Sequence, residues 1–259
     1  MSSSNEFAVL VLSCDKYSDL WDPFFECFDR YWPDCPYPIY LGSNTINYNK
    51  EKITTLYSGE DKDWSTSTKK IINQIDAKYV WIFLEDIFIT SKIDTSYINE
   101  TFSFLKNNNG NFIHETTKIP QVTDNGIYNE YPRGMPYRVN VRGFWNKDYF
   151  IQLLLDGESP WNFEIMGSYR SSYDDGFYSV KKDVLTFVNM VEKGQWIRKS
   201  VQWCEQENIT LDINKREKLT SFYHIKSVLQ LIYFSIIVKV SWKLRLKLIN
   251  ILRKLIISY

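Results

Sequence analysis

The side chains best suited to chemistry are an adjacent acidic pair, Glu85-Asp86, which directly follows the apolar run YVWIFL (79–84). Such a run is typical of a buried strand, and open α/β sheets bind ligands at the carboxyl ends of their strands. Carboxylates at that position can hold a divalent cation, which can in turn bridge a nucleotide diphosphate. The alternative is a pair that caps a helix or faces solvent.

A second polar group follows the first apolar run, FAVLVL (7–12). Ser13, Cys14 and Asp15 come directly after it. An acidic residue at the end of a strand can bind the ribose or the base of a nucleotide. The alternative is that Asp15 is the N-cap of the following helix, and the residues alone leave both interpretations open.

A third group lies in 157–170, which combines carboxylates, aromatic rings, an amide and an arginine. Glu158, Trp161, Glu164 and Arg170 belong to it. Sugars are bound by ring stacking together with polar hydrogen bonds, and a Glu here could deprotonate an acceptor hydroxyl as a general base. The alternative is a structural loop whose rings fill the core.

Asp174-Asp175-Gly176 provides a further candidate for a base or a metal ligand, although such triplets are commonly turns. Four arginines flank these polar segments and could neutralise a diphosphate: Arg133, Arg138, Arg142 and Arg170. The sequence does not choose among them.

The elements that must position these groups follow an α/β pattern. A strand at 7–12, a helix at 19–31 and a strand at 36–42 form the opening unit of a doubly wound sheet. We expect further helices at 65–75, with a Ser/Thr cap, and at 96–106, 147–155 and 196–208. Further strands are expected at 79–84, 139–144 and twice within 177–190, whereas 111–139 is read as short strands and loops and 157–176 as a loop.

Composition excludes several classes of protein. The sequence has no P-loop, GxGxxG, GxSxG or HExxH motif, which argues against kinases, dehydrogenases, α/β-hydrolases and zincins. Two histidines make a His-rich zinc site improbable, and four irregularly spaced cysteines suggest free thiols in the cytoplasm. The amino terminus also lacks the features of a secretory signal.

The charge is unevenly distributed along the chain. The first 217 residues carry 31 acidic and 23 basic side chains, a net charge of −8, whereas 218–259 carries eight basic residues and no acidic one. An acidic body argues against a nucleic-acid partner. In the tail, cations alternate with Leu and Ile at helical spacing, which predicts a membrane-associating amphipathic helix at an anionic surface. The alternative is a helix packed on the domain or on another subunit.

Three segments together resemble a group of bacterial GT-A-like glycosyltransferases that is often associated with capsule and lipopolysaccharide biosynthesis. These segments are VLSCDKYSDLWDPFFECFDRYWPDCPYPIYLGSN, WSTSTKKIINQIDAKYVWIFLEDIFI and FWNKDYFIQLLLDGESPWNFEIMGS. The resemblance implies that Ser13, Cys14 and Asp15 lie beside the donor nucleotide. It places Glu85-Asp86 where such enzymes have a DxD metal motif, and it makes Glu164 a candidate base. This chain has Glu-Asp-Ile instead of DxD, so only Asp86 is carried over as a metal ligand.

We therefore predict a GT-A-like α/β domain over 1–217 and a basic helical tail over 218–259. The predicted activity is transfer of a sugar from a nucleotide-sugar donor to a glycan or lipid-linked glycan of capsule, O-antigen or lipopolysaccharide. Inversion follows from assuming a base, and retention is the alternative. The predicted location is the cytoplasmic face of the cell membrane. The alternative is a non-catalytic carbohydrate-binding or scaffold subunit with a degenerate GT-A fold.

The predicted site residues fall into four sets. Glu164 and Asp175 are the catalytic candidates, and Asp86 is the ligand of a divalent cation, Mn²⁺ or Mg²⁺. The nucleotide-binding candidates are Ser13, Cys14, Asp15, Ser65, Glu85 and Asp86, and the acceptor-binding candidates are Trp145, Trp161 and Arg170.

Overall fold

A computed structural model describes residues 6–117, 123–126 and 128–219. It also describes six single positions nearer the carboxyl terminus: Ile232, Ser241, Lys243, Leu244, Lys247 and Ile251. Most of the predicted tail, 218–259, therefore lies outside the described residues.

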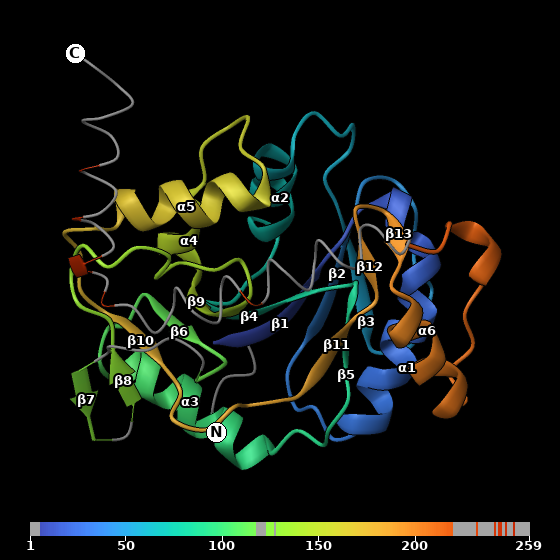
Figure 1. Ribbon diagram of the computed structural model, residues 1–259, viewed down its shortest axis with the longest axis horizontal. Helices are drawn as coiled ribbons and strands as arrows, with labels where there is room; N and C mark the ends of the chain where they lie inside the picture. Colours follow the sequence, from blue (N-terminus) through green and yellow to red (C-terminus); the bar gives the residue numbers. More distant parts are fainter. Residues whose placement is uncertain are drawn as a thin grey trace.

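The described residues form one large sheet of nine strands in the order β3-β2-β1-β4-β9-β6-β10-β8-β7 (Figure 1). The strands are β1 (Phe7–Leu12), β2 (Ile39–Ser43), β3 (Ile53–Tyr57), β4 (Tyr79–Leu84), β6 (Phe112–His114), β7 (Thr123–Asn125), β8 (Tyr128–Glu130), β9 (Gly143–Asn146) and β10 (Phe177–Ser179). Strands β3, β2, β1 and β4 pair in parallel, as do β6 and β10, whereas β9 and β8 pair antiparallel with their neighbours. The predicted mixed sheet of parallel and antiparallel strands is thus confirmed.

Both faces of this sheet are buried, which explains the unbroken apolar runs in the sequence. Side chains of a strand alternate between the two faces. In β1, Val9 and Val11 join one core cluster, whereas Ala8 and Leu10 join the other. Helices therefore have to cover the sheet on both sides.

Six α-helices flank the sheet in the described part of the chain. They are α1 (Trp21–Tyr31), α2 (Trp64–Ile72), α3 (Thr95–Asn107), α4 (Lys147–Leu153), α5 (Pro160–Arg170) and α6 (Arg198–Gln206), with 3-10 turns η1 (Asp15–Leu20) and η2 (Ile213–Lys215). Helices α2, α4 and α5 cover one face, while α1 and α3 contribute to the core on the other (Figure 1). Two short sheets, β5 (Ile87–Ile89) with β11 (Phe187–Asn189) and β12 (Val191–Glu192) with β13 (Gln195–Trp196), lie outside the main sheet.

One predicted loop is a helix. Residues 157–176 were expected to be irregular, but Pro160–Arg170 forms α5. Its start follows the rules for a helix N-terminus: the Ser159 side chain accepts a hydrogen bond from the backbone N–H of Asn162, and Pro160 occupies the first turn. This correction matters because α5 carries Glu164.

Smaller differences concern the cap of α2 and two strands. The cap of α2 is Asp63, whose carboxylate accepts from the backbone N–H of Thr66, and not a Ser or Thr. Strand β3 was not predicted, and β9 occupies Gly143–Asn146 where a strand over 139–144 was expected.

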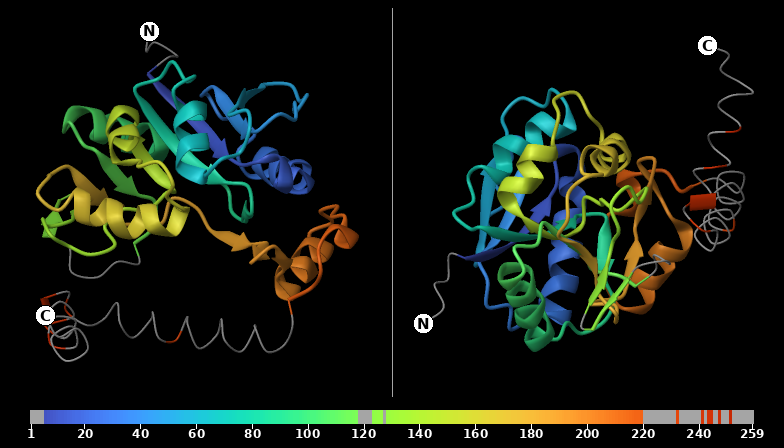
Figure 2. Two further views of the ribbon diagram at one scale, coloured as in Figure 1. Left: turned by 90° about the horizontal axis from the view of Figure 1, so that it is seen from above. Right: turned by 90° about the vertical axis from the view of Figure 1, so that its left-hand side faces the viewer.

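The folded domain extends beyond the predicted boundary at residue 217. The backbone N–H of Leu219 donates to the Trp196 carbonyl at 2.9 Å, and the Leu219 side chain is buried. Figure 2 shows α6 and this last segment in orange and α1 in blue, and the Arg30 guanidinium of α1 donates to the Glu207 carbonyl directly after α6 at 2.8 Å. Among the described residues, no helix has the length and apolar character needed to cross a membrane.

Candidate functional site

A cleft of about 440 Å³ opens at the carboxyl ends of β1 and β4. Small-molecule binding sites typically have volumes of roughly 300–1,000 Å³. The lining residues are Leu12, Ser13, Cys14, Tyr17, Asn44, Asp61, Trp64, Ser67, Thr68, Ile71, Leu84, Glu85, Asp86, Ile87, Val141, Pro160, Trp161 and Glu164. The cleft therefore joins the ends of three parallel strands to α2 and α5.

Glu85 and Asp86 occupy the turn between β4 and β5. Strand β4 is buried along its length, and the Asp86 carbonyl accepts from the backbone N–H of Met190 at 2.7 Å, which fixes the turn. Burial raises the pKa of both carboxyl groups, and for Glu85 the neighbouring Asp86 charge adds to the effect. Two carboxylates so placed are destabilised as free anions, and a bound cation would relieve that cost.

Ser13 and Cys14 line the cleft beside this pair. The Ser13 hydroxyl accepts from the indole N–H of Trp21 at 2.7 Å, so its position is fixed by α1. Burial, helped by the nearby Glu85 charge, raises the pKa of the Cys14 thiol to about 11. Cys14 is therefore a neutral thiol at physiological pH, suited to packing and weak hydrogen bonding but not to nucleophilic attack.

Asp15 does not line the cleft, and neither of its predicted roles matches its position. Its carboxylate accepts hydrogen bonds from the Ser43 hydroxyl and from the backbone N–H groups of Asn44, Thr45 and Ile46. Desolvation opposes the charged form, but the hydrogen bonds from Thr45 and Ser43 outweigh it and hold the pKa well below its usual range. Asp15 thus fastens the loop after β2 to the loop after β1.

Glu164 lines the cleft from α5. One carboxylate oxygen accepts from the backbone N–H of Val141 at 3.2 Å, and burial raises the pKa of the group. A carboxyl group that is held in place and has a raised pKa is a stronger base than an exposed one, which suits a general base.

Of the predicted acceptor-binding residues, only Trp161 lines the cleft. Trp161 is 73% exposed, at the first turn of α5. Trp145 is fully buried in the core, where its indole donates to the Val141 carbonyl, so it cannot contact a ligand.

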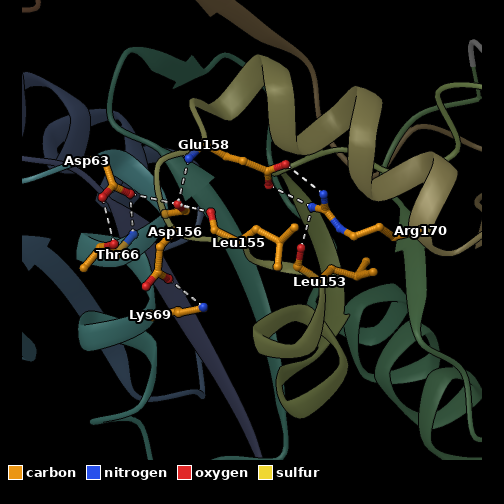
Figure 3. A network of polar contacts seen from close by, with 9 residues as sticks. Asp63, Thr66, Lys69, Leu153, Leu155, Asp156, Glu158 and Arg170 are labelled. Atoms are coloured by element: carbon orange, nitrogen blue, oxygen red, sulfur yellow. Dashed lines mark hydrogen bonds and ion pairs between the residues drawn. The ribbon is translucent and has the colours of Figure 1, made fainter.

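Arg170 is part of a polar network that holds α5 to its preceding loop (Figure 3). Its guanidinium donates to both oxygens of Glu158, at 2.7 and 2.8 Å, and to the Leu153 carbonyl at 2.5 Å. Arg170 does not line the cleft, and its charge is paired with that of Glu158.

Ser65, a predicted nucleotide-binding residue, belongs to the same network rather than to the lining of the cleft. It is fully buried, its hydroxyl donates to the Leu155 carbonyl and it accepts from the backbone N–H of Glu158. Ser67 and Thr68, one turn further along α2, line the cleft instead.

Asp175, the second catalytic candidate, lies on the surface away from the cleft. Its carboxylate is 65% exposed and forms a bidentate ion pair with Arg133, which holds its pKa below the usual range. A group paired in this way and outside the cleft is poorly placed to take a proton from an acceptor.

Two buried arginines partly neutralise the negative charge of the cleft without lining it. Arg142 pairs with the buried Glu115, and burial lowers the pKa of Arg142 to about 10. Arg216 forms a bidentate pair with Asp19 at 2.6 and 2.8 Å and lies 4.4 Å from the centre of the Tyr17 ring. Both charges favour ionisation of Asp86, and neither side chain is among the residues that line the cleft.

Several lining residues were not predicted from the sequence. Asn44 could have been found, because it follows β2 as Ser13 follows β1, and parallel strands end at the same edge of a sheet. Asp61 and Trp64 could not, because they approach the cleft through long-range contacts without a local motif.

No protein-family profile matches this sequence, and no curated protein matches it. Similar folds occur among solved structures. Residues 1–349 of S. aureus TarS in complex with UDP align over 70% of this chain and 59% of that chain, with 8% identity and a TM-score of 0.48. The galactosyltransferase LgtC, in complex with donor and acceptor sugar analogues, aligns over 67% of this chain and 72% of that chain, with 10% identity and a TM-score of 0.39.

A putative nucleotide-diphospho-sugar transferase from Desulfovibrio desulfuricans G20 aligns over 67% of this chain and 78% of that chain, with 9% identity and a TM-score of 0.41. This chain spans less than two thirds of the TarS chain that it matches. These similarities concern the fold alone, and we infer the function from the residues of this chain.

Proposed function

We propose that this protein is a glycosyltransferase that moves a sugar from a nucleotide-sugar donor to a hydroxyl group of a glycan or lipid-linked glycan. The observation that carries this proposal is one cleft that combines strand-end carboxylates, Glu85 and Asp86, with a positioned carboxylate of raised pKa, Glu164. Glu85 and Asp86 suit the charged part of the donor, and Glu164 suits activation of an acceptor hydroxyl.

The charge of the cleft supports a donor that binds together with a divalent cation. The lining includes four carboxylates (Asp61, Glu85, Asp86 and Glu164), and no lysine or arginine is among the described residues that form it. A diphosphate would be repelled by such a surface unless a cation were bound with it. In the described part of the chain no group of three or more His, Cys, Asp or Glu residues is arranged to hold a metal ion.

The carboxylates of the cleft fit Mg²⁺ or Mn²⁺ only if the substrate supplies further oxygen ligands. Mg²⁺ is commonly held by one or two carboxylates plus substrate phosphates and water. We propose that Asp86, assisted by Glu85, supplies the protein ligands. When bound, the cation would neutralise charge on the leaving diphosphate.

Glu164 is proposed to act as the general base. It would take the proton from the acceptor hydroxyl as that oxygen forms a bond with the anomeric carbon. The bond between the anomeric carbon and the diphosphate oxygen breaks, and its electron pair leaves with the nucleoside diphosphate. A single displacement of this kind inverts the configuration at the anomeric carbon.

We further propose that the acceptor belongs to capsule, O-antigen or lipopolysaccharide and that the protein works at the cytoplasmic face of the membrane. The resemblance of three sequence segments to glycosyltransferases associated with these glycans supports the acceptor class. The eight cations and alternating Leu and Ile residues of 218–259 support the location.

The donor is tested by thermal unfolding with UDP-, GDP-, CMP- and dTDP-sugars, each with Mn²⁺ and with EDTA. A ligand at 100 times its dissociation constant adds about 2.7 kcal/mol to the free energy of unfolding, which raises the Tm by several degrees. We expect one donor class to raise the Tm with Mn²⁺ and not with EDTA. Asp86→Asn should remove that rise.

The matched control is Asp156→Asn, which removes an exposed carboxylate paired with Lys69 at 2.8 Å. It should leave the Tm rise intact. A Tm rise that persists in EDTA would retain the transferase and remove the metal. No response to any donor would favour a scaffold subunit with a degenerate fold.

A further inference from the structure

The outer side of α5 carries an unusual concentration of exposed rings and apolar side chains. Thirteen large hydrophobic side chains are exposed among the described residues, and six of them lie on or beside this helix. We call these six the α5 surface: Tyr137, Trp161, Ile165, Met166, Tyr169 and Tyr173. Exposed apolar side chains grouped in this way mark binding surfaces more often than isolated ones do.

The α5 surface follows helical geometry and begins at the cleft. Trp161, Ile165 and Tyr169 are spaced four residues apart, so they form one continuous row along the helix. Trp161 also lines the cleft, as does Glu164 on a neighbouring position of the same helix. With a rise of 1.5 Å per residue, the row extends about 12 Å from Trp161 to Tyr169, away from the cleft.

A small second cavity of about 60 Å³ lies at the far end of this row. Tyr137, Ile165 and Tyr169 are among the residues that line it. Two hydrogen bonds hold the 134–139 segment along α5: the Val139 N–H donates to the Ser168 hydroxyl at 3.1 Å, and the Gly134 N–H donates to the Ser172 carbonyl at 2.8 Å. The cavity is therefore built by two segments that are fixed to each other.

Tyr137 is held in a costly backbone conformation at this cavity. Its φ is +58°, in the left-handed region that a bulky residue rarely adopts, and its side chain is 56% exposed. Strain of this kind persists where the surrounding structure imposes it, and it is concentrated at functional sites. Here it keeps an aromatic ring in solvent beside Tyr169 instead of in the core.

Resting on the proposed function, we propose that the α5 surface binds the non-reacting part of an oligosaccharide acceptor. The aromatic rings offer flat apolar faces for the C–H faces of sugar rings, and the tyrosines add hydroxyl groups for hydrogen bonds. The row is longer than one sugar ring, so the acceptor is a chain of several sugar units. Its reacting end lies at Trp161 and Glu164.

The charges around the surface favour a glycan over a membrane. An interfacial membrane helix presents Lys or Arg beside its apolar face. The single cation of α5, Arg170, is paired with Glu158, and the exposed Asp174 and Asp175 follow the helix. Asp175 is itself paired with Arg133, so α5 and the turn that follows it offer anionic lipid no unpaired cation.

The test is binding of the full-length protein to a glycan array printed with capsule and lipopolysaccharide oligosaccharides of one to six sugar units. Wild type should bind a subset of chains of three or more units. Tyr169→Ala and Tyr137→Ala should each weaken that binding about tenfold or more, whereas Tyr169→Phe should largely retain it. Tyr57→Ala, which removes an exposed ring on β3, is the matched control and should have no effect.

Each other outcome contradicts the inference. Wild-type protein that binds no oligosaccharide, or binding that Tyr169→Ala does not change, would overturn it. So would a variant that loses self-association in sedimentation, or binding to anionic vesicles, while its glycan binding is unchanged. These results would assign the α5 surface to a second copy of the chain or to a membrane.

The donor measurement separates this inference from the proposed function. Tyr169→Ala should unfold at the wild-type Tm and keep the Tm rise caused by the nucleotide sugar. Glycan binding that depends on Tyr169, without any response to donors, would overturn the transferase and leave the inference standing. A donor response with glycan binding independent of Tyr169 would do the reverse.

Discussion

At the scale of single residues, the proposed chemistry depends on one carboxyl group with an unusual environment. Burial raises the pKa of Glu164, whereas the hydrogen bond from the Val141 N–H and the Arg142 charge favour the anion and oppose the rise. The net rise makes Glu164 a stronger base than an exposed Glu.

Glu164→Gln should leave donor binding unchanged and lower the rate of sugar transfer about 100-fold or more, because the amide cannot accept the proton. The base must be deprotonated, and its pKa is raised above the ordinary Glu value of about 4.3. The wild-type rate should therefore fall as the pH drops through that raised pKa and reach a plateau above it. Initial rates between pH 4.5 and 8.5 would measure this profile.

Asp175→Asn is the control, and it should transfer sugar at the wild-type rate. A large loss in that variant, with full activity in Glu164→Gln, would contradict the assignment and make the surface carboxylate the base.

Part of the site was predictable at this scale because of one rule about strand ends. Ser13, Cys14, Glu85 and Asp86 were found because they directly follow buried strands. The same rule failed for Asp15, which also follows β1 but does not line the cleft. Its carboxylate instead accepts hydrogen bonds from Ser43 and from the loop after β2. The position of a residue in the sequence does not show which hydrogen-bond partners its side chain has in the folded protein.

At the scale of elements, α5 supplies Trp161 and Glu164 to the lining of the cleft. The sequence of α5 does not predict a helix, because its apolar residues are not confined to one face. Phe163 is buried, whereas Ile165 and Met166 are exposed. A binding surface on the outer side removes the periodicity that reveals an amphipathic helix. The Ser159-Pro160 start was the remaining local signal.

The Arg170–Glu158 pair should matter for stability rather than for acceptor binding. Arg170→Ala removes bonds to Glu158 and to the Leu153 carbonyl at a mostly buried position, so we expect a loss of about 1–3 kcal/mol. Urea unfolding would measure it. The acceptor KM of the remaining folded enzyme should change little.

Lys69→Ala serves as the comparison, because it breaks the more exposed pair with Asp156 in the same network (Figure 3). It should cost under about 1 kcal/mol. A stable Arg170→Ala protein with a raised acceptor KM would instead restore Arg170 to the acceptor site.

At the scale of the whole molecule, we propose that the acidic domain carries the activity and that the basic tail binds the membrane. Deleting 225–259 should abolish sedimentation with vesicles that contain phosphatidylglycerol, because all but one of the eight tail cations are removed. The Tm should stay close to that of the full chain, since Leu219 and its bonds to Trp196 are retained.

Added salt should weaken the binding of the full chain to the same vesicles, as expected for exposed charges. A truncated protein that still sediments with vesicles, or that aggregates, would show that 225–259 packs on the domain or on another subunit.

The Asp19–Arg216 pair also has a consequence for biosynthesis. It joins positions 197 residues apart, and the Arg216 side chain lies against Tyr17, a wall of the cleft. A ribosome that adds about 5–20 residues per second needs roughly 10–40 s to reach Arg216 after it has made Asp19. During that interval the nascent chain has its first strand but not the residue that secures the loop behind it. The cleft is therefore completed only after Arg216 has been synthesised.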